Sequence, residues 1–271
     1  MTKRLFDTHT HINSDDYTGE QRSALIARIE ASDVAYAVDI AFDLPSARQA
    51  VRDAQENPWC YAAVGIHPHD AETLTDEALE ALRKLAWESK KPGGENAVVA
   101  IGEIGLDFYR DLSPRDVQRE AFRRQIRLAK ELGLPVTIHD RDSAGETVEI
   151  LKDEGLLHPG AAQRVLLHCF SGSAEQALEY IGLGALISIA GPVTYKNNKK
   201  TVRVAEQVPI EHLVIETDAP YLTPEPFRGR PNESPYVEYV ARKIAELKGV
   251  PYEEVARATC ENAKRFFGIS T

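Results

Sequence analysis

Histidines and carboxylates in this chain stand directly after short apolar runs at several places along the sequence. Six of the eight histidines occupy such positions, and acidic residues occupy others. The candidates are Thr8-His9-Thr10-His11, His67-Pro68-His69, Gly102-Glu103, His139, His168 and Glu216-Thr217-Asp218. Imidazole and carboxylate groups are the usual protein ligands of divalent transition metals. If the runs are parallel strands, these groups meet at one edge, and the sequence predicts a metal centre there.

Each of these residues has an ordinary structural interpretation when it is taken alone. His9 and His11 are two apart and share one face of an extended chain, but such pairs are often structural. His139 and His168 would fit as hydrogen-bonded core residues, and Asp218 as the cap of a turn. Glu103 would fit an exposed turn, since burying a carboxylate without a counter-charge is costly. Repetition at five or six strand ends favours the metal site over these separate interpretations.

The number of candidate ligands suits one or two divalent ions, with Mg²⁺, Mn²⁺ and Zn²⁺ as the candidates. Two ions held about 3.5–4 Å apart can activate a water molecule and stabilise a leaving oxygen. Glu103 has two carboxylate oxygens and could bridge them. Asp218 could bind one ion and accept the proton of the attacking water. The predicted reaction is metal-assisted hydrolysis of an ester, an amide or a phosphodiester.

Short β-branched or apolar runs alternate with longer amphipathic segments along the chain. The eight expected strands are Leu5–Thr8, Val34–Ile40, Tyr61–Ile66, Val98–Ile101, Pro135–Ile138, Val165–Leu167, Ala185–Ile189 and Leu213–Ile215. The clearest expected helices are Asp76–Ser89, Arg115–Leu132 and Ala174–Ile181. Gly133-Leu134-Pro135 and Gly249-Val250-Pro251 predict helix ends. This alternation predicts an α/β fold of the closed (β/α)₈ TIM-barrel type, with a doubly wound open sheet as the alternative.

No linker, repeat or composition break divides the chain, so we expect a single barrel domain over residues 1–271. Pro224–Pro235 is expected to form a long loop after the eighth strand, and Pro251–Phe267 a closing helix. The sequence has no apolar signal region, no membrane-length apolar stretch and no disulfide pattern among its three cysteines. We therefore expect a soluble, cytoplasmic monomer without a membrane partner. The net charge of −10 argues against broad electrostatic binding to DNA.

Six motifs, in this order, resemble those of a known family. They are Phe6-Asp7-Thr8-His9-Thr10-His11, Gly65-Ile66-His67-Pro68-His69, Gly102-Glu103-Ile104-Gly105-Leu106-Asp107, Ile138-His139, His168-Cys169-Phe170-Ser171-Gly172 and Glu216-Thr217-Asp218-Ala219-Pro220-Tyr221-Leu222. Over essentially its whole length the chain is similar to the TatD family of metal-dependent deoxyribonucleases, within the amidohydrolase-like barrels. The resemblance implies a (β/α)₈ barrel that uses divalent metal to degrade DNA from strand ends, as a 3′-to-5′ exonuclease on single strands.

The resemblance also implies roles for single residues. One metal ion would be held by His9, His11, Glu103 and Asp218. The second would be held by Glu103, His139 and His168. His67 would lie near the substrate phosphate. Arg228 and Arg230 match the family's basic loop after strand eight and would contact phosphate, although Pro231 and Ser234 depart from its commonest form. Relatives with a carbamylated bridging lysine need that lysine at the end of strand four, where this chain has Glu103.

The leading hypothesis is a metal-dependent deoxyribonuclease that hydrolyses phosphodiester bonds at DNA strand ends, with Asp218 and Glu103 as catalytic residues. A metal-dependent ester or amide hydrolase, such as a D-aminoacyl-tRNA deacylase, is the first alternative, because the same ligands would serve it. A non-catalytic metal-binding scaffold is the second alternative. Cys169 follows His168 on the expected strand, so we expect it to face the helices as a small core residue.

Overall fold

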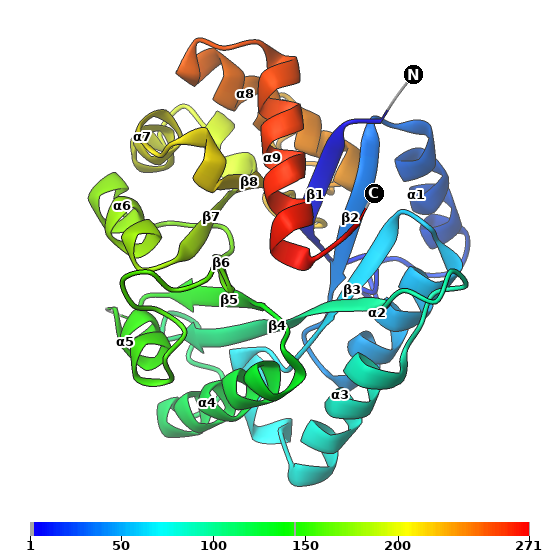
Figure 1. Cartoon of the computed structure of the whole chain (residues 1–271). Helices are drawn as coiled ribbons and strands as arrows, with labels where there is room; N and C mark the ends of the chain where they lie inside the picture. The colour runs from blue at the N-terminus through cyan, green and yellow to red at the C-terminus, as the bar shows by residue number, and fades with distance from the viewer. Residues whose placement is uncertain (1–2, 144, 271) are drawn as a thin grey trace.

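The computed structural model describes residues 3–143 and 145–270, in which strands and helices alternate around a barrel (Figure 1). The strands are β1 (Leu5–Thr10), β2 (Val34–Ile40), β3 (Cys60–Val64), β4 (Val98–Asp107), β5 (Val136–Arg141), β6 (Val165–Leu167), β7 (Ala185–Ile189) and β8 (Leu213–Ile215). The helices are α1 (Glu20–Ala31), α2 (Leu44–Glu56), α3 (Asp76–Glu88), α4 (Arg115–Leu132), α5 (Glu146–Asp153), α6 (Ala174–Gly182), α7 (Lys199–Gln207), α8 (Val237–Lys248) and α9 (Tyr252–Phe267). None of the helices in these ranges combines the length and apolar character that a membrane crossing requires.

Strand pairing confirms the predicted TIM barrel. The strands follow one another around the sheet in chain order, and each neighbouring pair is parallel. This order excludes the doubly wound alternative, in which the strand order reverses inside the sheet. Closure occurs between β1 and the segment that follows β8. There the Asp218 amide donates to the His9 carbonyl at 2.9 Å, and the His11 amide donates to the Ala219 carbonyl at 2.8 Å.

We call this contact, which joins His9–His11 to Asp218–Ala219, the seam of the barrel. It contains a parallel bridge between Thr10 and Ala219, outside the named β8 strand. Just below it, the Thr8 hydroxyl donates to the Ile215 carbonyl at 3.1 Å. The first and last strands therefore meet mainly through residues at the C-terminal end of the barrel.

The fourth strand is longer than the sequence predicts. We expected it to end at Ile101, but β4 continues to Asp107 and all of its residues are buried. The extension is possible because Gly105 pairs with His139, where a Cβ atom on Gly105 would lie 1.9 Å from the His139 carbonyl oxygen. Glycine lets the two backbones approach this closely. Glu103 consequently lies inside β4 and not after its end.

The barrel interior is packed with side chains and is covered at its N-terminal end by α9, which lies over β1 and β8 in Figure 1. Phe6 of β1 stacks on Phe267 of α9, with ring centroids 5.8 Å apart. Burying one such aromatic side chain stabilises a fold by about 1.5–3 kcal/mol. The predicted closing helix is thus confirmed, and this end of the barrel is core. The opposite end carries the loops that follow the strands.

Helix ends follow the predicted signals. The α4 helix ends at Leu132, and Gly133 adopts a left-handed conformation with φ of +68°. The α8 helix ends at Lys248, and Gly249 has φ of +66°. Glycine takes up this conformation without the steric cost that a side chain brings, so both helices stop there. Pro135 and Pro251 directly precede the next elements, β5 and α9.

Unusual backbone conformations are concentrated at the C-terminal mouth of the barrel. Among the described residues, five non-glycine residues have φ between +43° and +56°: Asp111, Asp142, Cys169, Asp218 and Leu222. All five lie in loops that follow β4, β5, β6 or β8. Such conformations cost about 1–3 kcal/mol each and are retained mainly where a site requires them. These backbone conformations therefore indicate a functional site at this mouth.

Candidate metal centre

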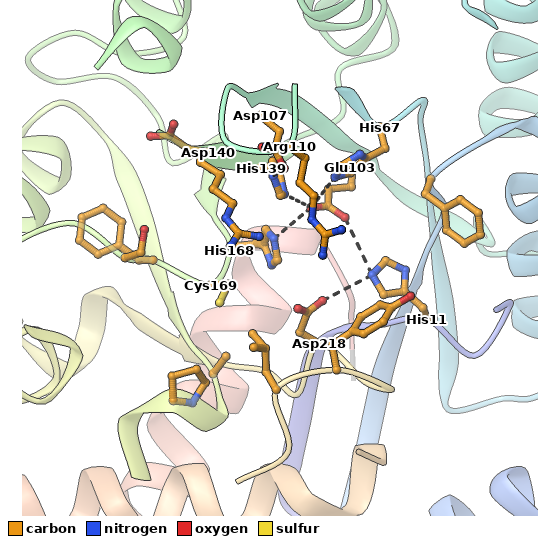
Figure 2. A pocket seen from close by; sticks show the side chains of 18 of the residues that line it. His11, His67, Glu103, Asp107, Arg110, His139, Asp140, His168, Cys169 and Asp218 are labelled. Carbon is orange, nitrogen blue, oxygen red and sulfur yellow. Dashed lines mark hydrogen bonds and ion pairs between the residues drawn. The ribbon is translucent and has the colours of Figure 1, made fainter. Parts of the chain in front are cut away.

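The mouth contains a cavity of about 710 Å³, lined by most of the residues that the sequence singles out (Figure 2). The predicted ligands that line it are His11, Glu103, His139, His168 and Asp218, together with His67. His9 lies beneath them and is completely buried. The structure thus brings together all six predicted metal ligands, which come from β1 and the residue after it, from β4 and β5, and from the segments that follow β6 and β8.

One group of donor atoms surrounds the seam. The Nε2 atoms of His9 and His11 lie 3.3 Å apart. Glu103 Oε2 lies 3.4 Å from His9 Nε2 and 3.9 Å from His11 Nε2. Asp218 Oδ1 lies 3.7 Å and 3.5 Å from the same two nitrogens. Four donors from three segments of the chain therefore face one point.

A second group surrounds the other oxygen of Glu103. Oε1 lies 2.7 Å from His139 Nδ1 and 3.0 Å from His168 Nε2. His67 Nε2 lies 3.7 Å from the same oxygen, so His67 belongs to this group by distance. Each oxygen of Glu103 faces a different set of imidazoles, which is the arrangement expected of a carboxylate that bridges two ions.

Charge in the centre keeps the two carboxylates ionised but keeps only some of the histidines neutral. Burial raises the pKa of Glu103, but the surrounding histidines outweigh it and hold this pKa well below its usual value. Burial likewise raises the pKa of Asp218, but the hydrogen bond with His11 and the charges of the surrounding histidines together outweigh it and lower this pKa. Burial lowers the pKa of His9 and, more strongly, that of His67, which keeps both imidazoles neutral. Burial also lowers the pKa of His11 and of His168, but neighbouring carboxylates outweigh it and raise both, so these two imidazoles must give up a proton to bind a cation. Carboxylates and imidazoles are the usual ligands of divalent metals, so the donor set fits a metal.

Two carboxylates orient the histidines from outside the donor groups, and sequence reasoning missed both roles. Glu216 is completely buried, and its Oε1 lies 3.2 Å from His168 Nδ1 and accepts a 2.6 Å hydrogen bond from the Cys169 amide. Asp107 Oδ2 lies 3.2 Å from His139 Nε2 and 2.8 Å from His69 Nε2. Carboxylates in these positions fix the ring and tautomer of a metal-binding histidine.

These contacts also favour a protonated histidine when no metal is bound. Burial lowers the pKa of His139, but hydrogen bonds with Asp107 and Glu103 outweigh it and raise this pKa to about 9. A cation must therefore displace a proton from His139 when it binds. The signal for Glu216 was present in the sequence, because Glu216 directly follows the expected eighth strand in the same motif as Asp218, whereas Asp107 lies beyond the expected end of the fourth strand.

The prediction that Cys169 faces the helices is wrong. The β6 strand ends at Leu167, so the alternation of faces along a strand does not extend to Cys169. Cys169 adopts φ of +43° and lines the cavity instead. The hydrogen bond from its amide to Glu216 holds the chain in this turn.

The predicted basic loop lies farther from the donor groups. Arg228 and Arg230 are exposed and are not among the residues that line the cavity. The guanidinium group of Arg228 stacks on the ring of Tyr195, 4.3 Å from its centroid. Two arginines that line the cavity are Arg110 and Arg141, in the segments after β4 and at the end of β5. Arg110 was not singled out by its sequence context.

Comparisons with known proteins identify the family of this chain. A family model described as TatD related DNase matches residues 6–268, which is nearly the whole chain. The chain belongs to the TatD family. As a TatD-family member it is a metal-dependent hydrolase, and the resemblance predicted from the six motifs is confirmed.

Named relatives of this TatD-family chain support the same assignment. It is 46% identical to the uncharacterized metal-dependent hydrolase YabD of Bacillus subtilis (strain 168), over 98% of this chain and 100% of that protein. It is 34% identical to the 3′-5′ ssDNA/RNA exonuclease TatD of Klebsiella pneumoniae (strain 342), over 98% of each chain. The crystal structure of YJJV, a TatD homologue from Escherichia coli K12, matches with a TM-score of 0.88 and 31% identity over 100% of each chain.

Proposed function

We propose that this chain hydrolyses phosphodiester bonds at the 3′ end of single-stranded DNA, with two divalent metal ions as cofactors. The observation that carries the proposal is the position of the Glu103 carboxylate. Its two oxygens face separate donor groups at distances of 2.7–3.9 Å. Two-ion sites are typical of enzymes that displace an oxygen at phosphorus. Relatives that are 34–35% identical carry the name 3′-5′ ssDNA/RNA exonuclease, which supports the choice of substrate.

The two donor groups support the following ligands for each ion, with His67 of the second group left to contact the substrate. The first ion would be held by His9, His11, Glu103 and Asp218. The second would be held by Glu103, His139 and His168. Divalent ions supply Lewis-acid polarisation of the phosphate and a lowered pKa of bound water. Mg²⁺, Mn²⁺ and Zn²⁺ are all compatible with this mixture of imidazole and carboxylate donors.

Asp218 is proposed to accept the proton of the attacking water. Its carboxylate is 15% exposed to the cavity, so water can reach it, while its backbone is held by the hydrogen bond to His9 in the seam. The interaction with His11 lowers its pKa, which keeps Asp218 ionised and able to take a proton at neutral pH. Glu103 would act together with Asp218 by contributing one carboxylate oxygen to each of the two donor groups.

Substrate contacts are proposed for His67, Arg228 and Arg230. Burial keeps His67 neutral, so its imidazole can donate one hydrogen bond to a phosphate oxygen without adding charge. Arg228 and Arg230 are exposed beyond the cavity and would contact phosphates farther along the strand. Their contribution would be electrostatic and would weaken as salt is added.

The proposal is tested with Asp218→Asn on single-stranded DNA labelled at its 5′ end, with Mg²⁺ or Mn²⁺ added to the apo-protein. We expect kcat to fall by about 10²–10⁴-fold, the usual contribution of a general base, while the far-ultraviolet circular dichroism is unchanged. Asp70→Asn is the matched control, because Asp70 lines the same cavity but belongs to neither donor group. No release of nucleotides by the wild-type protein would overturn the proposed function, and full exonuclease activity in Asp218→Asn would overturn the role of Asp218.

The same experiment separates the leading proposal from ester hydrolysis. The donor atoms alone would serve a carbonyl ester as well as a phosphodiester, so D-aminoacyl-tRNA is assayed beside the DNA. Release of the amino acid with no cleavage of DNA or RNA would assign the centre to deacylation. Stoichiometric metal binding with no hydrolysis of either substrate would assign it to a scaffold.

A further inference from the structure

Large apolar side chains that are exposed to solvent gather at the mouth of the barrel. Five such side chains occur among the described residues, and three of them are Tyr109, Leu112 and Tyr221. Tyr109 and Leu112 lie after β4, and Tyr221 lies after β8, where it lines the cavity. Exposed apolar area is unfavourable in water, and its concentration beside a cavity indicates a surface that binds a ligand.

Tyr221 is held firmly although its side chain is 56% exposed. Its amide donates to the Asp218 carbonyl at 2.8 Å, and its own carbonyl accepts a 2.6 Å hydrogen bond from Asn232 Nδ2. The ring meets the His11 imidazole edge-on, with centroids 6.3 Å apart. The backbone of Tyr221 is therefore fixed, and its ring lies at the cavity beside His11, a predicted metal ligand.

Arg110 supplies a cation to the same cavity. Its amide donates to Asp107 Oδ1 at 2.8 Å, which fixes the backbone, and Figure 2 shows its side chain pointing into the pocket. Over residues 3–143 and 145–270, its guanidinium group has neither an ion pair nor a hydrogen bond. By contrast, Arg141 stacks on the Tyr109 ring at 4.1 Å. Arg110 is therefore available to an anion.

We propose that Tyr221 and Arg110 form the binding subsite for the terminal nucleotide of a single strand, an inference that rests on the proposed nuclease function. The base stacks on the Tyr221 ring, and the Arg110 guanidinium group binds a phosphate oxygen. A base paired and stacked inside a duplex has no free face for the ring. The subsite consequently selects strand ends that are unpaired, and it tolerates every base because each has a π-face.

The test uses two single strands that differ only at the 3′-terminal nucleotide, which carries a base in one and is abasic in the other. The quantity measured is the ratio of kcat/KM for the two strands with Mn²⁺-loaded protein. Wild type is expected to prefer the strand with the base by about 5- to 150-fold. Tyr221→Leu is expected to abolish this preference, and Tyr221→Phe to keep it. Trp87→Leu, an exposed aromatic on α3, is the matched control and leaves the preference unchanged.

Arg110→Gln has a different expected signature. It raises KM for both strands by a similar factor, because the phosphate is present in each, and it leaves the preference for the base intact. Hydrolysis of both strands at equal kcat/KM by wild type would overturn the subsite while the proposed function stands. Equal losses on both strands in Tyr221→Leu would also overturn it, since a merely structural role has that effect. No hydrolysis of any strand would overturn the proposed function and the subsite with it.

Discussion

Replacing Gly105 by alanine tests the close approach of β4 and β5 beside the metal centre. A Cβ atom on Gly105 would lie 1.9 Å from the His139 carbonyl oxygen and 2.8 Å from its carbonyl carbon. Real Cβ atoms essentially never approach a neighbour within 3.0 Å, so the two strands must separate by about 1 Å. The backbone at Gly105 also has φ of +149°, a conformation that L side chains rarely adopt.

The magnitude follows from these two effects. Overpacking of a buried site costs about 1–3 kcal/mol. A non-glycine residue in a glycine conformation costs about 1–3 kcal/mol more. We therefore expect Gly105→Ala to lower the free energy of unfolding of the apo-protein by about 4 kcal/mol. That loss is a large share of the roughly 5–15 kcal/mol that stabilises a typical domain.

Urea denaturation of the apo-protein, followed by circular dichroism, measures the loss. Gly133→Ala is the matched control, because Gly133 also has a positive φ but nothing lies within 4 Å of its Cβ position. The control should cost about 1–2 kcal/mol, the price of the left-handed conformation alone. A loss below 1 kcal/mol in Gly105→Ala, or equal losses in both variants, would refute the reasoning from close approach.

Three further predictions concern charge and metal. Glu216→Gln weakens the hold on His168 Nδ1, and Mn²⁺ affinity measured by calorimetry should fall about 10- to 100-fold; unchanged affinity would contradict this role. In the folded protein, burial raises the pKa of Asp39 to about 7, whereas the unfolded chain loses this proton near pH 4. The free energy of unfolding therefore falls as the pH rises from about 4 to 7. Asp39→Asn should remove about 3 kcal/mol of that fall between pH 5 and pH 8, measured by urea denaturation at these two pH values, and an identical pH profile would refute it. Chelation of the metal should lower thermal stability, and Mn²⁺ at 100 times its Kd should restore about 2.7 kcal/mol; a Tm independent of Mn²⁺ would contradict binding to the folded state.

Elements bounded by strong local signals could be predicted from the sequence. The β2, β6, β7 and β8 strands have the predicted bounds, because each is a β-branched or apolar run between polar segments. The α4 helix also has its predicted bounds, since Gly133 ends it. The parallel order then places the ends of all strands at one mouth. For this reason the six predicted ligands could be grouped without knowing any distance.

Features that depend on contacts between distant segments could not be predicted. The extension of β4 to Asp107 relies on the approach of β5 to Gly105, which has no local signature. The turn at Cys169 depends on Glu216, which lies on the other side of β7 in the sequence. The single domain over residues 1–271, the monomeric state and the cytoplasmic location stay predictions. The roles of Arg228 and Arg230 likewise stay predictions.

The seam of the barrel couples completion of the chain to assembly of the metal centre. His9 and His11 stand on one side of the seam, and Asp218 stands on the other. During synthesis the first two are made early, whereas Asp218 emerges only after most of the chain has been translated. A nascent or C-terminally truncated chain therefore has an incomplete set of donors for the first ion. If Asp218 is a ligand of the first ion as proposed, we expect hydrolysis only after the ring has closed.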